Sequence, residues 1–349
     1  MQCPYPVDVG KAGAARKLAA AAAFGGGGLS VVGASLYGVL WAEALLARRT
    51  IGNADGEPPD STGWYGKGRS GPALKVALLG DSSAAGYGVD AVEETPGAHL
   101  ASGLAEGADR RVYLRSVAFV GAQTRDLSRQ IDKALSIEPQ VAVILVGAND
   151  VTHSRRPSES VRLLEAAVRR LREAGAEVVV GTCPDLGTIE PIAPPLKQVA
   201  RLWSRRLAAA QTIATVEAGG RTVSLASVLG SEFAASPTFF GPDRFHPSAS
   251  GYSALASVLL PSVLAAVGVI PFEEIVPEPQ RGEAILPISQ AAVEATRTPG
   301  TEIDGTEVAG STRGARGRWV QLRRRRRQPE SDVESPRSQP ETAGETAGA

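Results

Sequence analysis

The chain has 349 residues, of which 37 are Lys or Arg and 37 are Asp or Glu, so its formal net charge of zero gives no indication of a nucleic-acid partner. The hydrophobic fraction of 43% is that of an ordinary globular protein and supports a sizeable core. The two cysteines, Cys3 and Cys183, are too few for a disulfide framework or a recognisable metal site.

The first element in chain order is an apolar N-terminal segment. No charged residue occurs from Leu18 to Ala42, and a helix of about 20 apolar residues can cross a membrane core of ~30 Å. The length of this run favours a signal anchor or transmembrane helix over 18–42, while a cleaved signal peptide and a soluble helix stay open. The cations in residues 1–17 favour a cytoplasmic or flexible N-terminus. We therefore expect a protein that is membrane-anchored outside the cytoplasm, or secreted or held in the cell wall.

The next segment, 43–72, is rich in Gly, Pro, Asp and Ser and predicts a linker. From 73 to 270, short apolar or β-branched runs alternate with amphipathic stretches. This pattern predicts one α/β domain, a three-layer α/β/α sandwich of flavodoxin-like type with a central, mostly parallel sheet. The strands are expected at Leu74–Leu79, Val112–Val117, Val141–Val146, Glu177–Gly181 and Thr222–Leu225, and the helices at Ala98–Glu106, Thr124–Leu135, Glu159–Ala174, Leu196–Glu217 and Ala249–Val267. Residues 271–349 lose this periodicity and predict an extended, mostly disordered tail.

The first predicted strand runs directly into Gly80, Asp81 and Ser82. Open α/β sheets bind their ligands at the carboxyl ends of parallel strands, so a serine here is placed to react. A Gly-Asp-Ser tripeptide is also a common turn, and by itself it is weak evidence of catalysis.

A serine nucleophile needs a base that titrates near neutral pH, and the chain offers only three histidines. His246 follows Asp243 by three residues, a spacing that lets the carboxylate hold the imidazole in one tautomer while the other nitrogen faces the serine. His99 and His153 lack an acid at a useful spacing. We therefore predict that Ser82, His246 and Asp243 form the reacting group.

Two further strand ends lie at the same edge of the predicted sheet. One continues to Gly121, whose backbone N–H can approach a bound carbonyl closely, and the other ends in Gly147, Ala148 and Asn149, whose amide is a donor. Together with the Ser82 N–H, these groups are expected to form an oxyanion hole. Gly121 as a turn residue and Asn149 as a helix cap are the structural alternatives.

In order and spacing, these segments resemble the SGNH (GDSL-like) hydrolases, a superfamily named for a Ser, a Gly, an Asn and a His. The resemblance covers about 74–267 and is strongest at 243–247, where the sequence reads Asp-Arg-Phe-His-Pro. It departs at Ser83, where the family motif has Leu, which makes Ser83 a rival nucleophile. With the apolar N-terminus, the chain looks most like the exported actinobacterial esterases of this type.

The resemblance implies a serine esterase, lipase or deacetylase that acts on a small acyl ester, possibly of a glycan or lipid, with no cofactor and no metal. The short predicted loops favour a shallow site and short acyl chains of the acetyl type. An O-acyltransferase that transfers the acyl group to a glycan or lipid acceptor is the nearest alternative, and a non-catalytic membrane-anchored binding protein is an alternative of another class. In the tail, the run Arg323–Arg327 is expected either to contact an anionic surface or to be solvated.

Overall fold

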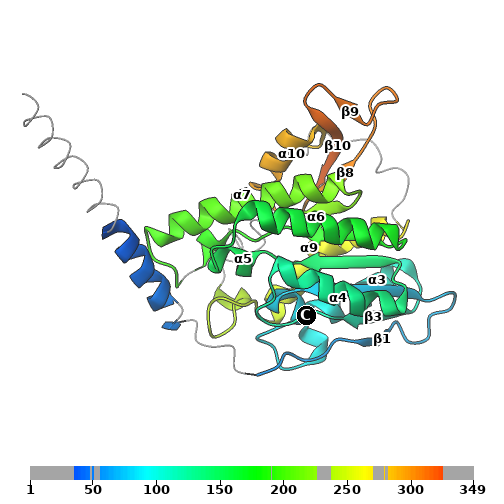
Figure 1. The fold of residues 1–349 in the computed structure, drawn as a ribbon. Coiled ribbons are helices and arrows are strands. Elements are labelled where there is room, and N and C mark those ends of the chain that lie inside the picture. The colour runs from blue at the N-terminus through cyan, green and yellow to red at the C-terminus, as the bar shows by residue number, and fades with distance from the viewer. Residues whose placement is uncertain are drawn as a thin grey trace, which may run out of the picture.

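A mixed sheet of ten strands forms the centre of the protein (Figure 1). The computed structural model describes residues 35–47, 49–50, 56–189, 191–225, 237–269, 279 and 282–324. The centre of the sheet consists of five parallel strands in the spatial order β3 (Val112–Ser116), β2 (Leu74–Gly80), β4 (Val141–Leu145), β5 (Glu177–Gly181) and β6 (Arg221–Val223). Because β2 lies between β3 and β4, the order reverses there, and this is the point at which an open α/β sheet binds its ligand.

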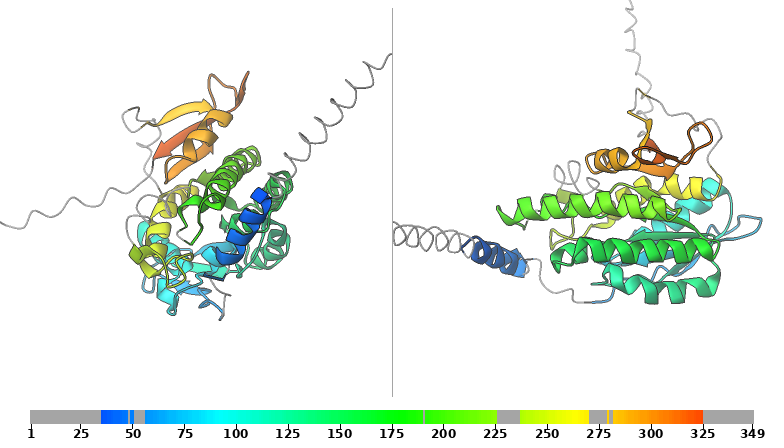
Figure 2. Two further views of the ribbon diagram at one scale, coloured as in Figure 1. Left: turned by 90° about the vertical axis from the view of Figure 1, so that its left-hand side faces the viewer. Right: turned by 45° about the horizontal axis from the view of Figure 1, so that its top comes forward.

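Helices cover both faces of the parallel strands. The helices α3 (Pro96–Ala108) and α9 (Ala249–Ala266) lie on one face, and α4 (Leu127–Ala134), α6 (Pro157–Glu173) and α7 (Leu196–Glu217) lie on the other, where Figure 2 shows α6 and α7 side by side. Successive residues of β2 alternate between the two cores: Val76 and Leu78 face α3 and α9, whereas Ala77 and Leu79 face α4 and α6. The central strands are buried on both sides, which explains their continuous apolar sequences.

The predicted elements of the α/β domain agree closely with the structure. The strand Glu177–Gly181 and the helix Leu196–Glu217 have the predicted bounds, and the other predicted elements differ by one or two residues at their ends. The predicted segment 124–135 divides into η2 (Thr124–Asp126), α4 and the start of a second 3₁₀ turn, η3 (Leu135–Ile137).

The C-terminal region departs from the prediction. Residues 284–324 form β7 (Ala284–Pro287), α10 (Ile288–Ala295), β8 (Thr301–Gly305), β9 (Arg313–Gly314) and β10 (Gly317–Arg324), which extend the sheet beyond β6 with antiparallel pairing (Figure 1). The expectation of disorder is therefore wrong for this part of the tail, and the sheet is mixed instead of mostly parallel. Residues 325–349 lie outside the described residues.

A buried carboxylate explains why the composition of this region was misleading. Glu302 in β8 is fully buried, and its carboxylate pairs with Arg221 at 3.3 Å and Arg323 at 3.7 Å and accepts the Ser262 hydroxyl at 2.6 Å. The charges of Glu302, Arg221 and Arg323 are therefore paired with one another, whereas the sequence pattern of this region indicates a solvated segment. Within the run Arg323–Arg327, Arg324 also pairs with Glu294, and Arg325 to Arg327 lie outside the described residues.

The other end of the sheet carries one more unpredicted strand. β1 (Gly63–Tyr65) lies within the predicted linker and pairs antiparallel with β3, where the Trp64 and Tyr113 rings lie 5.1 Å apart. Ahead of it, Ser35–Ala47 is an apolar helix, and residues 18–34 of the predicted membrane segment lie outside the described residues. By length and composition, α9 is the one helix in the described part of the chain that could cross a membrane, but it packs into the core.

Candidate active site

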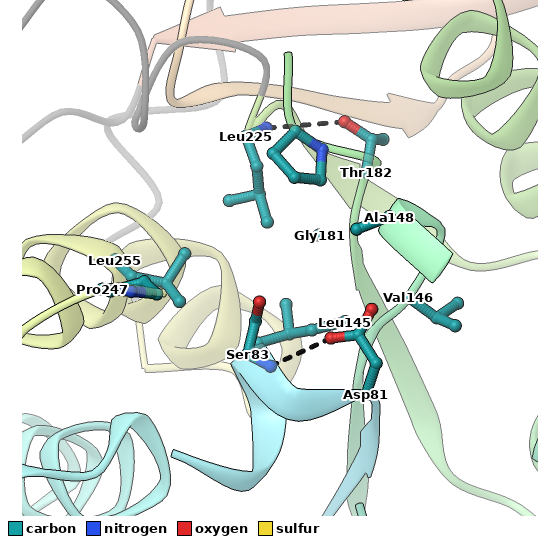
Figure 3. Close-up of a pocket in the computed structure, with 11 residues that line it drawn as sticks. Asp81, Ser83, Leu145, Val146, Ala148, Gly181, Thr182, Leu225, Pro247 and Leu255 are labelled. Atoms are coloured by element: carbon teal, nitrogen blue, oxygen red, sulfur yellow. Dashed lines mark hydrogen bonds between the residues drawn. The ribbon is translucent and has the colours of Figure 1, made fainter. Parts of the chain in front are cut away.

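The turn after β2 places Ser82 at the reversal of strand order. Gly80 has a φ of +140°, and a Cβ at this position would collide with the Leu145 carbonyl of the neighbouring strand. Asp81 then caps the short helix α2 (Ser82–Ala85), since its carboxylate accepts the Ser83 N–H at 3.0 Å (Figure 3). Ser82 is the first residue of this helix and is 7% exposed.

His246 and Asp243 reach Ser82 from the loop before α9. The Nε2 atom of His246 lies 3.1 Å from Ser82 Oγ, and its Nδ1 atom lies 2.6 Å from Asp243 Oδ2. The loop is held in shape by Asp243 Oδ1, which accepts the N–H groups of Phe245 and His246, and by the Gly241 N–H, which donates to the His246 carbonyl. The three side chains thus form one hydrogen-bonded series from carboxylate through imidazole to hydroxyl, which is the arrangement needed to activate a nucleophile.

The surroundings of His246 keep its partner ionised and its ring in place. Burial opposes ionisation of Asp243, but hydrogen bonds from the His246 side chain and from two backbone N–H groups outweigh it and hold the pKa of Asp243 below its ordinary value. The rings of Tyr87 and Phe245 contact the imidazole edge-on, with centroids at 4.6 and 4.8 Å. The Tyr252 hydroxyl of α9 donates to the Tyr87 carbonyl at 2.6 Å and so ties this turn to the helix after His246.

The carboxyl group of Asp81 is in a different electrostatic environment. Burial, together with the nearby charge of Asp150, raises the pKa of Asp81 to about 7 against the opposing hydrogen bonds from Ser83. Asp150 itself accepts the Thr124 N–H and hydroxyl and the Ser160 hydroxyl, so its carboxylate is satisfied. Asp81 therefore titrates near neutral pH beside Ser82, whereas Asp243 remains charged.

The predicted donors lie at the ends of β3 and β4. Gly121 has a φ of +81°, which favours glycine, and it is exposed at the rim of the site. Asn149 belongs to α5 (Ala148–Thr152), which begins three residues after β4, and one N–H of its amide donates to the Ala122 carbonyl at 3.0 Å. This hydrogen bond joins the two loops and leaves the second amide N–H for another acceptor.

The remaining sequence candidates lie apart from this hydrogen-bonded series. Ser83 lines a small pocket beside it, and His153 lies 2.8 Å from the Asn149 carbonyl on the exposed side of α5. His99 belongs to α3, and Cys183 is a buried free thiol whose pKa is raised well above its ordinary value by burial. Across the described ranges, no group of three or more His, Cys, Asp or Glu side chains is arranged to hold a metal ion.

Two glutamines that support the site were not predicted from the sequence. The amide of Gln130 in α4 bonds both the N–H and the carbonyl of Gly80 at 2.8 Å. The amide of Gln211 in α7 accepts the Cys183 N–H at 2.7 Å and donates to the Val146 carbonyl at 3.0 Å. Each satisfies buried backbone groups at strand ends, and the Gly80 carbonyl also accepts the Phe119 N–H at 3.3 Å. A polar residue on an otherwise apolar helix face is the signal that could have identified them.

Comparison with known proteins identifies the family of this chain and several similar proteins. Residues 78–254 match the model of the GDSL-like lipase/acylhydrolase family. A GDSL-like esterase of Mycobacterium tuberculosis is 40% identical over 255 residues, which cover 69% of this chain and 80% of that protein. Among solved structures, TesA is 19% identical with a TM-score of 0.44, covering 56% of this chain and all of its own. A catalytic mutant of Axe2, an acetylxylan esterase from Geobacillus stearothermophilus, is 18% identical with a TM-score of 0.43, covering 58% and 95%.

Proposed function

The chain belongs to the GDSL-like lipase/acylhydrolase family and is an esterase of that family, and on this premise we propose that it hydrolyses short-chain acyl esters with Ser82 as nucleophile, His246 as base and Asp243 as the orienting acid. The observation that carries the proposal is the hydrogen-bonded series of 3.1 Å and 2.6 Å that joins these three side chains.

The first half of the reaction forms an acyl-enzyme. Ser82 Oγ attacks the ester carbonyl carbon while His246 Nε2 takes the hydroxyl proton, and the Asp243 carboxylate stabilises the resulting imidazolium through Nδ1. The carbonyl oxygen becomes an oxyanion, for which the Ser82 N–H, the Gly121 N–H and the Asn149 amide are the proposed donors. When the tetrahedral intermediate collapses, the carbon–oxygen bond to the alcohol breaks, and His246 returns its proton to the leaving alkoxide.

The second half releases the acid. Water occupies the place of the departed alcohol, gives a proton to His246 Nε2 and attacks the acyl carbon. The second tetrahedral intermediate expels Ser82 Oγ, which regains the proton from His246. Every proton moved is accounted for by the single imidazole between Ser82 and Asp243.

The local structure around Ser82 supports an open site for small acyl groups. β2 passes into α2 through Asp81 alone, and β4 passes into α5 through Val146 and Gly147. These connections are too short to carry a lid over Ser82. Short connections at these two strand ends support the proposal of small ester substrates, which bind without a long acyl groove.

Substitution of Ser82 tests the proposal. Ser82→Ala should lower kcat/KM for p-nitrophenyl acetate by at least about 10³-fold and abolish labelling by a fluorophosphonate, because no alkoxide nucleophile remains. Ser83→Ala separates the neighbouring hydroxyl and should keep the label. Labelling that survives Ser82→Ala and disappears in Ser83→Ala would assign the reaction to the wrong serine and contradict the proposal.

We also propose that the apolar segment 18–42 anchors the esterase to a membrane. The helix Ser35–Ala47 exposes Leu36, Tyr37 and Trp41, whereas Ala47 packs against the cluster that includes Leu186 and Ile189. Sedimentation of the full chain with membranes after a carbonate wash supports the anchor, and recovery of the full-length protein in the supernatant contradicts it.

A further inference from the structure

The pocket beside the nucleophile has apolar walls and one wall position that differs from the family motif. It lies between the carboxyl ends of the central strands and α9, and Figure 3 shows the Ser83 side chain directed into it. The residues used in the argument, which define the Ser83 pocket, are Ser83, Ala148, Pro184, Leu225, Pro247 and Leu255.

The position of this pocket relates it to the reaction. Ser83 follows Ser82, Pro247 follows His246, and Ala148 precedes Asn149. Three residues of the pocket wall are thus chain neighbours of the proposed nucleophile, base and oxyanion donor, which do not themselves line it. Ser83 is only partly buried, whereas Ser82 is 7% exposed.

The chemistry of the walls selects an aliphatic group. Leu225 and Leu255 supply apolar side chains, and the polar neighbours are already bonded: Asp81 accepts the Ser83 N–H, and the Thr182 hydroxyl accepts the Leu225 N–H at 3.4 Å. The cavity volume is about 20 Å³, whereas a cavity needs about 10–15 Å³ to hold one water molecule. The pocket therefore has room for one or two groups of the size of a water molecule, so an alkyl group of one or two carbons is near the upper limit of what it admits.

We propose that the Ser83 pocket binds a short alkyl group of the ester substrate, and that the serine at position 83 makes the room for it. The family motif has Leu at this position, and a leucine side chain directed as Ser83 is would fill the space between Leu225 and Leu255. Ser83 is thereby a specificity-determining residue that sets the chain-length limit. The inference rests on the proposed function, since it concerns a substrate held at Ser82.

The experiment alters the pocket in opposite directions. Ser83→Leu fills it, Leu225→Ala enlarges it, and Ser257→Leu, which makes the same change at an exposed position of α9, is the matched control. For each variant, kcat/KM is measured for p-nitrophenyl acetate, propionate, butyrate and hexanoate, and for ethyl, propyl and butyl acetate. These two series identify whether the acyl group or the alcohol occupies the pocket.

In one of the two series, Ser83→Leu should lower the ratio of long-chain to short-chain kcat/KM by about tenfold or more, and Leu225→Ala should raise this ratio. The reason is that one methylene in an apolar pocket changes kcat/KM by about 10- to 200-fold. Ser257→Leu should leave the ratio unchanged. Chain-length ratios that stay at the wild-type value in both series, in folded variants that still label at Ser82, would overturn the pocket assignment alone. Loss of the proposed function itself would instead be detected by a Ser82→Ala protein that remains active.

Discussion

Replacing Asp243 by Asn tests the electrostatic core of the proposed mechanism. Asparagine keeps an oxygen that can accept the N–H groups of Phe245 and His246, so the loop should retain its shape. The amide NH₂ would then face His246 Nδ1 and favour the tautomer with the proton on Nε2, which cannot accept a proton from Ser82.

The size of the effect follows from the 2.6 Å contact between His246 Nδ1 and Asp243 Oδ2. Opposite charges about 4 Å apart interact by about 4 kcal/mol at an effective dielectric constant near 20, which corresponds to about 10³-fold in rate. Asp243 is partly exposed, and this reduces the Coulombic share, whereas the wrong tautomer adds to the loss. We expect a decrease in kcat of about 10³- to 10⁴-fold, in line with the same substitution at another Ser-His-Asp site.

The assay compares kcat/KM for p-nitrophenyl acetate and the rate of fluorophosphonate labelling, because both need the activated Ser82 hydroxyl. Asp109→Asn, which alters an exposed ion pair with Arg69, is the matched control and should retain wild-type values. The pKa of Asp243 lies below its ordinary value, so its carboxylate is ionised at the neutral pH of both measurements. A decrease of less than tenfold in both measurements would refute the assigned role.

Three further predictions concern the donors and the buried charges. Asn149→Ala should lower kcat by about 10²- to 10³-fold with a smaller effect on KM, and an unchanged kcat would exclude Asn149 from the oxyanion hole. The pKa of Asp81 is raised to about 7 in the folded protein, so between pH 4 and pH 7 the folded state binds a proton that the unfolded state has lost. The free energy of unfolding should therefore fall by up to about 4 kcal/mol as the pH rises through this range. Urea titrations at pH 5 and pH 8 should show this decrease in the wild type and not in Asp81→Asn. The same change in the free energy of unfolding in both proteins would contradict the prediction. Glu302→Ala removes the buried carboxylate that Arg221 and Arg323 share, and it should lower the free energy of unfolding by about 3 kcal/mol in urea titrations. Glu307→Ala, at an exposed position, should have no effect, and equal unfolding midpoints of the two variants would disprove the importance of the buried carboxylate.

Much of the α/β domain could be predicted because its signals are local. Strands such as Val141–Leu145 are buried on both faces and are apolar throughout, and α7 is marked by an unbroken amphipathic run. The candidate site could be predicted for a related reason: parallel strands share their carboxyl ends, so Ser82, Gly121 and Asn149 had to lie at one edge once their strands were identified. His246 required chemistry in addition, namely the need for a base and the nearby Asp243.

The rest depended on partners that are distant in sequence. The strand Thr301–Gly305 contains two acids and has no clear alternation, and it forms because Glu302 meets Arg221, 81 residues earlier, inside the sheet. The edge strand Gly63–Tyr65 is too short to stand out within a segment rich in Gly and Pro, and it exists only because β3 offers an unpaired edge.

The sequence by itself thus determined the strand and helix pattern, the reacting residue types and the edge of the sheet at which they gather, since these follow from local periodicity and from the shared direction of parallel strands. Only the tertiary structure decided that His246 stands 3.1 Å from Ser82, that Ser83 is directed into an apolar pocket, and that the charged C-terminal segment completes the sheet. The physical reason is that burying a charge or opening a pocket depends on the groups opposite, which the chain brings together only when it folds.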